Sequence, residues 1–146
     1  MTTVYSVGTW GVSGYLVEIE VDLRRGLPHF ELLGLPGQSL RESRARVHTA
    51  IGRSGFLFPG HRVTVQLSPA HRPKDGSGYD LAIALGILAA SGQIDPRLLR
   101  RVLAVGELGL NGALKPVPQG FLGLELAENH KMVPLLPKAM AATAAA

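Results

Sequence analysis

Hydrophobic and polar positions are distributed most unevenly in residues 71–92. The first half of this stretch is a polar loop rich in the turn formers glycine and proline. The second half, residues 81–90, contains no polar side chain, so a helix there has no polar stripe to present to solvent. Ser77 and Asp80 have the spacing of a capping box. The pattern therefore predicts a central helix that is buried on two faces, begins after this loop and ends at Gly92.

The first 33 residues show the patterns of three β-strands. Residues 2–10 are rich in β-forming side chains, and residues 15–22 alternate between apolar and polar, so the two segments predict an antiparallel hairpin. A short strand at residues 30–33 follows, and the expected arrangement is a β-meander. The polar positions of the second strand form an acidic outer face: Glu18, Glu20 and Asp22.

A second helix is predicted from Ser39 to Gly55, because Ser39 and Glu42 again have capping-box spacing and apolar residues recur at the helical period. Residues 61–68 then alternate as a fourth strand that leads into the polar loop. On this helix two outer flanks carry cations: Arg41, Arg44 and His48 on one, Arg46 and Arg53 on the other.

The rest of the chain predicts shorter elements. Asn111-Gly112 is a strong hairpin signal, and Asp95-Pro96 is typical of a helix start. We expect a short helix ending near Arg101, strands at 102–108 and 113–117, a helix at 119–129 and a strand at 132–136. Strands and helices in this order predict an α+β fold, with helices packed against a mixed β-sheet.

Composition excludes several classes of site. The chain of 146 residues has no cysteine, so disulfides, thiol nucleophiles and thiolate zinc sites are excluded. Residues 1–20 hold no Lys or Arg and no continuous apolar segment, so we expect no signal peptide, no membrane association and a cytoplasmic location. The net charge of +4 equals the local excess of residues 24–53, which suits an anionic partner.

Three long strings carry a family resemblance. The strings are GLPHFELLGLPGQSLRESRARVHTAIGRSGF from Gly26, PKDGSGYDLAIALGILAASGQI from Pro73 and GELGLNGALKPV from Gly106. They resemble the N-terminal domain of the magnesium-chelatase-like AAA+ proteins, the YifB and ComM group, and together they cover nearly the whole chain in order.

The resemblance implies a fold. It is a ribosomal protein S5 domain 2-like sandwich, in which a mixed β-sheet packs on a buried central helix and flanking helices, as in the proteolytic domain of Lon. The resemblance also divides the chain into this N-terminal domain, residues 1–137, and the start of a linker, residues 138–146, toward an AAA+ ATPase module. No GxxxxGK[ST] string occurs in these residues, so ATP and Mg are expected only with that module and no cofactor is expected here.

The resemblance also implies a role. We expect a non-catalytic assembly or substrate-engagement domain of an AAA+ ATPase, which is not itself an enzyme. The expected partners are the AAA+ module of the same polypeptide and neighbouring subunits in a hexamer. DNA is a further expected partner, because the ComM branch is associated with competence and branch migration.

The polar loop before the central helix has two interpretations. In the first it is architecture, with glycines that allow the turn and side chains that satisfy the first amides of the helix. In the second it is an anion or docking site at a helix N-terminus. The candidate residues are Arg72, Lys74, Ser77 and Asp80.

The arginine-rich helix is either a solvated surface or a contact surface. Clustered cations suffice for phosphate contacts, so an autonomous DNA-binding module is an alternative. The aromatic residues Trp10, Tyr15 and Tyr79 are scattered along the sequence, which argues against a single-strand stacking platform. The candidate nucleic-acid or subunit contacts are Arg41, Arg44, Arg46 and Arg53.

A Lon-like hydrolase is the remaining alternative. Ser77 would be its nucleophile and Lys74 or Lys115 its base, but the family's catalytic serine and lysine positions hold other residues here. The five histidines include no pair at helical ligand spacing, so no metal site is expected.

Overall fold

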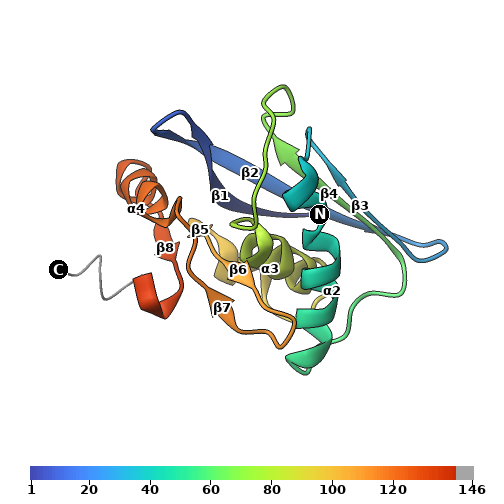
Figure 1. Cartoon of the computed structure of the whole chain (residues 1–146). Helices are drawn as coiled ribbons and strands as arrows, with labels where there is room; N and C mark the ends of the chain where they lie inside the picture. The colour runs from blue at the N-terminus through green and yellow to red at the C-terminus, as the bar shows by residue number, and fades with distance from the viewer. Residues whose placement is uncertain (141–146) are drawn as a thin grey trace.

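The alternating segments at the start of the chain form the centre of a six-stranded mixed sheet. The computed structural model describes residues 1–140 (Figure 1). The sheet order is β3-β4-β2-β1-β5-β8, and β1 and β2 are the predicted antiparallel hairpin. The strands are β1 (Thr2–Trp10), β2 (Ser13–Arg24), β3 (His29–Leu33), β4 (Arg62–Ser68), β5 (Val102–Ala104) and β8 (Val133–Leu135).

The predicted β-meander is wrong, because β4 lies between β2 and β3. β3 pairs with β4 in parallel, with Phe30 opposite Val63, and β2 pairs with β4 antiparallel. Parallel neighbours need a crossover, which the helices between β3 and β4 provide. β3 is therefore an edge strand of the sheet.

The predicted central helix is confirmed as α3 (Asp80–Ala90). It packs on the face of β1 and β2 that carries Val4, Ile19 and Val21, and Ile83 and Ile87 are fully buried there. A Cβ atom on Gly86 would lie 2.6 Å from a methyl group of Val21, so glycine allows the helix to approach the sheet closely. Gly92 adopts the expected left-handed conformation after the helix, with φ of 75°.

The predicted helix at residues 39–55 is two helices, α1 (Gln38–Arg41) and α2 (Ser43–Arg53). Neither is capped by the side chain of Ser39 or Glu42, so the predicted capping box is wrong. α2 packs beside α3 on the same face of the sheet (Figure 1).

The elements in the second half of the chain agree with the prediction, except that one expected strand is divided into two. The expected strand at 102–108 splits into β5 and β6 (Glu107–Leu108), because Leu103 pairs with Tyr5 in the main sheet while β6 forms a hairpin with β7 (Leu114–Lys115). The short helix is η1 (Pro96–Leu99), and the side chain of Asp95 caps it. Helix α4 (Gly120–Asn129) packs against the opposite face of the sheet, where it covers Val7 and Leu103.

These observations confirm an α+β fold with a mixed sheet, a buried helix and flanking helices; its likeness to ribosomal protein S5 domain 2 stays a prediction. The sheet face opposite α3 carries the predicted acidic row of β2. None of the helices within residues 1–140 is long and apolar enough to cross a bilayer.

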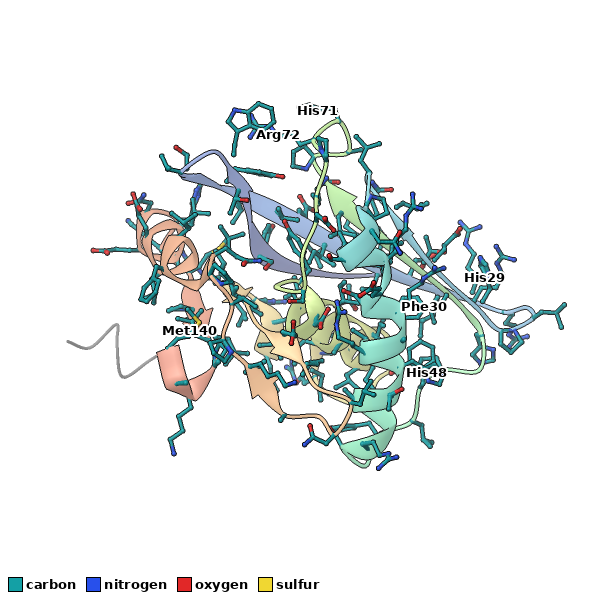
Figure 2. The ribbon with its side chains drawn as sticks, viewed as in Figure 1. His29, Phe30, His48, His71, Arg72 and Met140 are labelled. Carbon is teal, nitrogen blue, oxygen red and sulfur yellow. The ribbon has the colours of Figure 1, made fainter. Side chains whose placement is uncertain are left out.

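Packing continues past the predicted domain boundary at residue 137. Residues 138–140 are helical, and the side chain of Met140 is 5% exposed (Figure 2). Its terminal methyl group packs directly against Gly120, the first residue of α4. The rest of the predicted linker, residues 141–146, lies outside the described residues.

Candidate functional site

A buried polar network surrounds the start of α3. Asp80 is fully buried, and its carboxylate accepts hydrogen bonds from the Ser43 hydroxyl, from Arg46 Nε at 2.7 Å and from the Leu108 amide at 3.1 Å. The bond to Asp80 is the main reason that the pKa of Arg46 is raised. Asp80 therefore joins α2, α3 and β6. It does not form the predicted capping box with Ser77, because its side chain points away to these partners.

Lys74 is a second buried charge in the same loop, with 2% of its surface exposed. Its ammonium group donates to the carbonyl oxygens of Gly34, Pro69 and Arg72, at distances between 2.5 and 2.9 Å. These three acceptors use all three protons of the ammonium group. Burial lowers the pKa of Lys74. The cation therefore holds two loops together and has no proton left for an external anion.

Asp75, which follows this lysine, caps α1 from outside the helix. Its Oδ1 accepts a hydrogen bond from the Leu40 amide at 3.1 Å. A Cβ atom on Gly37 would lie 2.5 Å from the carboxyl carbon of Asp75, so glycine makes room for the cap. Hydrogen bonds from the backbone amides of Gly76, Leu40 and Ser39 hold the pKa of Asp75 below its ordinary value of 3.8.

Because the folded pKa of Asp75 is lowered, its stabilisation is present above pH 3.8 and is lost as the pH falls through the folded pKa. We expect Asp75→Ala to lower the free energy of unfolding by about 1 kcal/mol at pH 6, the usual value of an N-cap. Urea titrations of both proteins at pH 6 and pH 3 measure it. The difference should shrink at pH 3, and an unchanged difference would show that the charged carboxylate is not the cap.

The predicted docking loop is thus divided between interior and surface. Lys74 and Asp80 are bound within the fold, as is the carbonyl of Ser77, which accepts from the Asp80 amide at 3.2 Å. Arg72 is half-exposed, and its charged group has no carboxylate partner within residues 1–140. A docking role of this loop therefore remains a prediction for Arg72.

The four arginines predicted as nucleic-acid or subunit contacts do not share one environment in the structure. Arg46 is 18% exposed and committed to Asp80, Ser43 and the Ser39 carbonyl. Its place on an outer flank was a misassignment, since it points toward the interior beside α3. Arg41, Arg44 and Arg53 are exposed, as predicted.

The aromatic residues that appear scattered in the sequence are brought together in the structure. The guanidinium carbon of Arg72 lies 5.3 Å from the ring centroid of Trp10 and 4.7 Å from that of Tyr15. A Cβ atom on Gly8 would overlap the Tyr15 ring, so glycine leaves the space that this ring occupies. Burial raises the pKa of Tyr15, and the charge of Arg72 opposes that shift. Two of the aromatic residues that are separated in the sequence, Trp10 and Tyr15, thus share one neighbour, Arg72.

Trp10, Tyr15 and Arg72 form what we call the hairpin-tip cluster. Trp10 ends β1 and is 64% exposed, and Val12 in the adjoining turn is 93% exposed. His71 and Arg72 project at the same end of the molecule from the loop after β4 (Figure 2). Sequence reasoning missed the cluster because its members lie in separate segments, and only the β1–β2–β4 pairing brings them together.

The histidines also gather more than the sequence suggests. His29, His48 and His61 line one hollow of about 330 Å³ together with Phe30 and Phe58. Among the described residues no group of His, Cys, Asp or Glu side chains is arranged to hold a metal ion.

The sequence of this chain matches a known protein family and several known proteins. The family described as subunit ChlI of Mg-chelatase matches residues 19–139. The competence protein ComM of Haemophilus influenzae is 41% identical over 138 residues, which are 94% of this chain and 27% of that protein. The uncharacterized protein YifB of Escherichia coli K12 is 41% identical over 118 residues, 81% of this chain and 23% of YifB.

A protein of Mycobacterium tuberculosis H37Rv is 44% identical over 123 residues, 84% of this chain and 24% of that protein. The chain thus spans about a quarter of the length of the relatives it matches. The extent of the family match and the identity to these relatives agree with the long strings that suggested the resemblance. This chain belongs to the Mg-chelatase ChlI family, in its magnesium-chelatase-like YifB and ComM group.

Proposed function

We propose that this chain is the substrate-engagement domain of a magnesium-chelatase-like AAA+ protein and that it engages single-stranded nucleic acid through the hairpin-tip cluster. The observation that carries the proposal is the position of Arg72, whose guanidinium stacks over the rings of Trp10 and Tyr15. The domain would act without catalysis of its own. ATP, Mg and the subunit contacts of a hexamer would belong to the AAA+ module.

The cluster combines two groups that single-strand binding requires. An exposed indole offers a face on which a base can stack, and such stacking tolerates any sequence. A guanidinium that already lies over two rings loses little further conformational freedom when it binds a ligand. Its N–H groups can donate hydrogen bonds to a phosphate. Since no ion pair within residues 1–140 involves Arg72, its charge is not neutralised by a neighbouring carboxylate.

The interior charges support an engagement role over the Ser77 hydrolase. Lys74 keeps its protons in bonds to three carbonyl oxygens, and a general base must have a free lone pair. Lys115, the other candidate base, is exposed on β7. A serine-reactive probe that labels Ser77 would favour the hydrolase instead.

Trp10 is the single tryptophan of the chain, so its fluorescence reports on the cluster directly. We expect an oligothymidylate to quench this fluorescence saturably, with an affinity that falls as salt increases. Arg72→Ala should weaken binding about tenfold, because it removes both the phosphate contact and the support of the indole. A duplex of equal length should quench less, since its bases are already stacked.

Arg53→Ala is the matched control, because Arg53 is also exposed but ends α2 away from the cluster. It should leave the affinity unchanged. If Arg72→Ala and Arg53→Ala weaken binding equally, the interaction is general electrostatic attraction and the proposed site is wrong.

A further inference from the structure

The two edges of the main sheet differ in their capacity to accept another strand. β8 carries Pro134 at its centre, which has no amide proton to donate. β3 contains no proline, and it pairs with β4 on one side only. The His29 amide donates inward to the His61 carbonyl, so in a parallel ladder the backbone groups of Phe30 and Leu32 face outward.

Two hollows lie along this edge, between β3 and the helices α1 and α2. One is lined by Phe30 with His48 and Phe58, and the other by Leu32 with Arg41 and Arg44; each is about 330 Å³. Phe30 and Leu32 are two positions apart on one face of the strand. A strand added to this edge would place alternate side chains over the same two hollows, at a spacing of about 6.8 Å.

The first hollow has an aromatic surface. The rings of Phe30 and Phe58 are 5.2 Å apart, and those of His48 and Phe58 are 4.3 Å apart. Figure 2 shows His29, Phe30 and His48 on the same side of the molecule, where β3 faces α2. This hollow suits an aromatic or large apolar side chain.

The second hollow is cationic. Arg41 and Arg44 are exposed, and none of the ion pairs within residues 1–140 involves either. The acidic residue that also lines this hollow, Glu31, accepts a hydrogen bond from Thr64 and lies 3.8 Å from the His29 ring. The hollow therefore retains positive charge and suits a carboxylate side chain.

The end of β3 carries apolar surface in a strained conformation. Leu35 has a φ of 57°, which is unfavourable for a residue with a branched side chain, yet its side chain is 52% exposed. Leu27 and Leu33 are also exposed along this edge. The backbone of Leu35 is held there by the Lys74 amide, which donates to its carbonyl at 3.0 Å, and its exposed side chain adds apolar surface beside the two hollows.

We propose that the β3 edge binds an extended acidic segment of a partner protein as an added antiparallel strand. An Asp or Glu side chain would enter the Arg41/Arg44 hollow, and an aromatic side chain two residues later would enter the Phe30 hollow. Antiparallel pairing, the more stable arrangement, fixes this order, because the segment would run from the Leu32 end of β3 to the Phe30 end. The proposal uses none of the hairpin-tip residues and is independent of the nucleic-acid function.

The test measures fluorescence polarisation of a labelled octapeptide with a central Glu-x-Phe, titrated with the 146-residue chain. We expect saturable binding that Arg44→Ala weakens about tenfold, while Arg53→Ala, an exposed arginine on the same helix, leaves it unchanged. Leu35→Gly should weaken binding without lowering the thermal midpoint, because glycine relieves the strain while removing the apolar contact.

Peptide backbone methylation tests the added strand without altering the protein. N-methyl groups on one alternate set of residues should abolish binding, while the same groups on the other set should have no effect, since only one set faces β3. Equal effects of the two sets would overturn the proposal. It would also be overturned if Arg44→Ala and Arg53→Ala behaved alike, or if an oligothymidylate displaced the peptide, which would make the groove a nucleic-acid surface.

Discussion

Asp80→Ala is expected to lower the free energy of unfolding by about 3–5 kcal/mol, the usual cost of removing one partner of a buried ion pair. The fully buried carboxylate accepts from Ser43, Arg46 and the Leu108 amide. Its removal leaves donors from two elements, α2 and β6, without this acceptor. Urea denaturation at neutral pH, with circular dichroism as the signal, measures the loss.

The control is Arg44→Ala, because Arg44 is an exposed arginine of α2, the helix that carries Arg46; it should change stability by less than about 0.5 kcal/mol. Arg46→Ala should be costly by itself, and the double variant should cost less than the sum of the two singles. Additive costs would contradict the proposed coupling between Asp80 and Arg46.

Lys74→Met is expected to lower the free energy of unfolding by about 3 kcal/mol, although it makes the interior more apolar. The side chain length is similar, but the carbonyl oxygens of Gly34, Pro69 and Arg72 lose their donor. A buried acceptor without a partner costs about 1–3 kcal/mol. Thermal and urea unfolding of the variant measure the change.

Lys115→Met is the control, because Lys115 is exposed on β7. A stable Lys74→Met protein that had lost affinity for inorganic phosphate would contradict the structural role and restore the predicted anion site. The two lysine variants thus separate architecture from docking in this loop.

The elements with strong local patterns were predictable. α3 follows from ten apolar residues in succession, and the β1–β2 hairpin follows from alternation across a short turn. The position of β4 between β2 and β3 was not predictable, because strand order depends on which edges a crossover can reach. Apolar alternation in β3 is the same for either neighbour.

The candidate site was predicted less well, and the reason is the range of its contacts. Capping boxes were inferred from spacing within one helix, whereas α1 is capped by Asp75, 35 positions from Leu40. Arg46 was placed on the surface because charged residues usually lie there. Its buried partner, Asp80, is 34 positions away, so no local pattern reveals the pair. Stacking of Arg72 over Trp10 was hidden for the same reason.

The two faces of the main sheet are covered by apolar clusters of different size, so one side of the domain should be more stable against local unfolding than the other. Beneath α2 and α3 lies a broad apolar cluster that includes Val4, Ile19 and Ile83. The cluster beneath α4, around Val7 and Leu103, is much smaller and shares no residue with it. If α4 detached, the larger cluster would stay buried. The free energy of this local opening should therefore be well below that of global unfolding. Heat or denaturant should accordingly loosen this molecule from α4 inward, before the cluster beneath α2 and α3 opens.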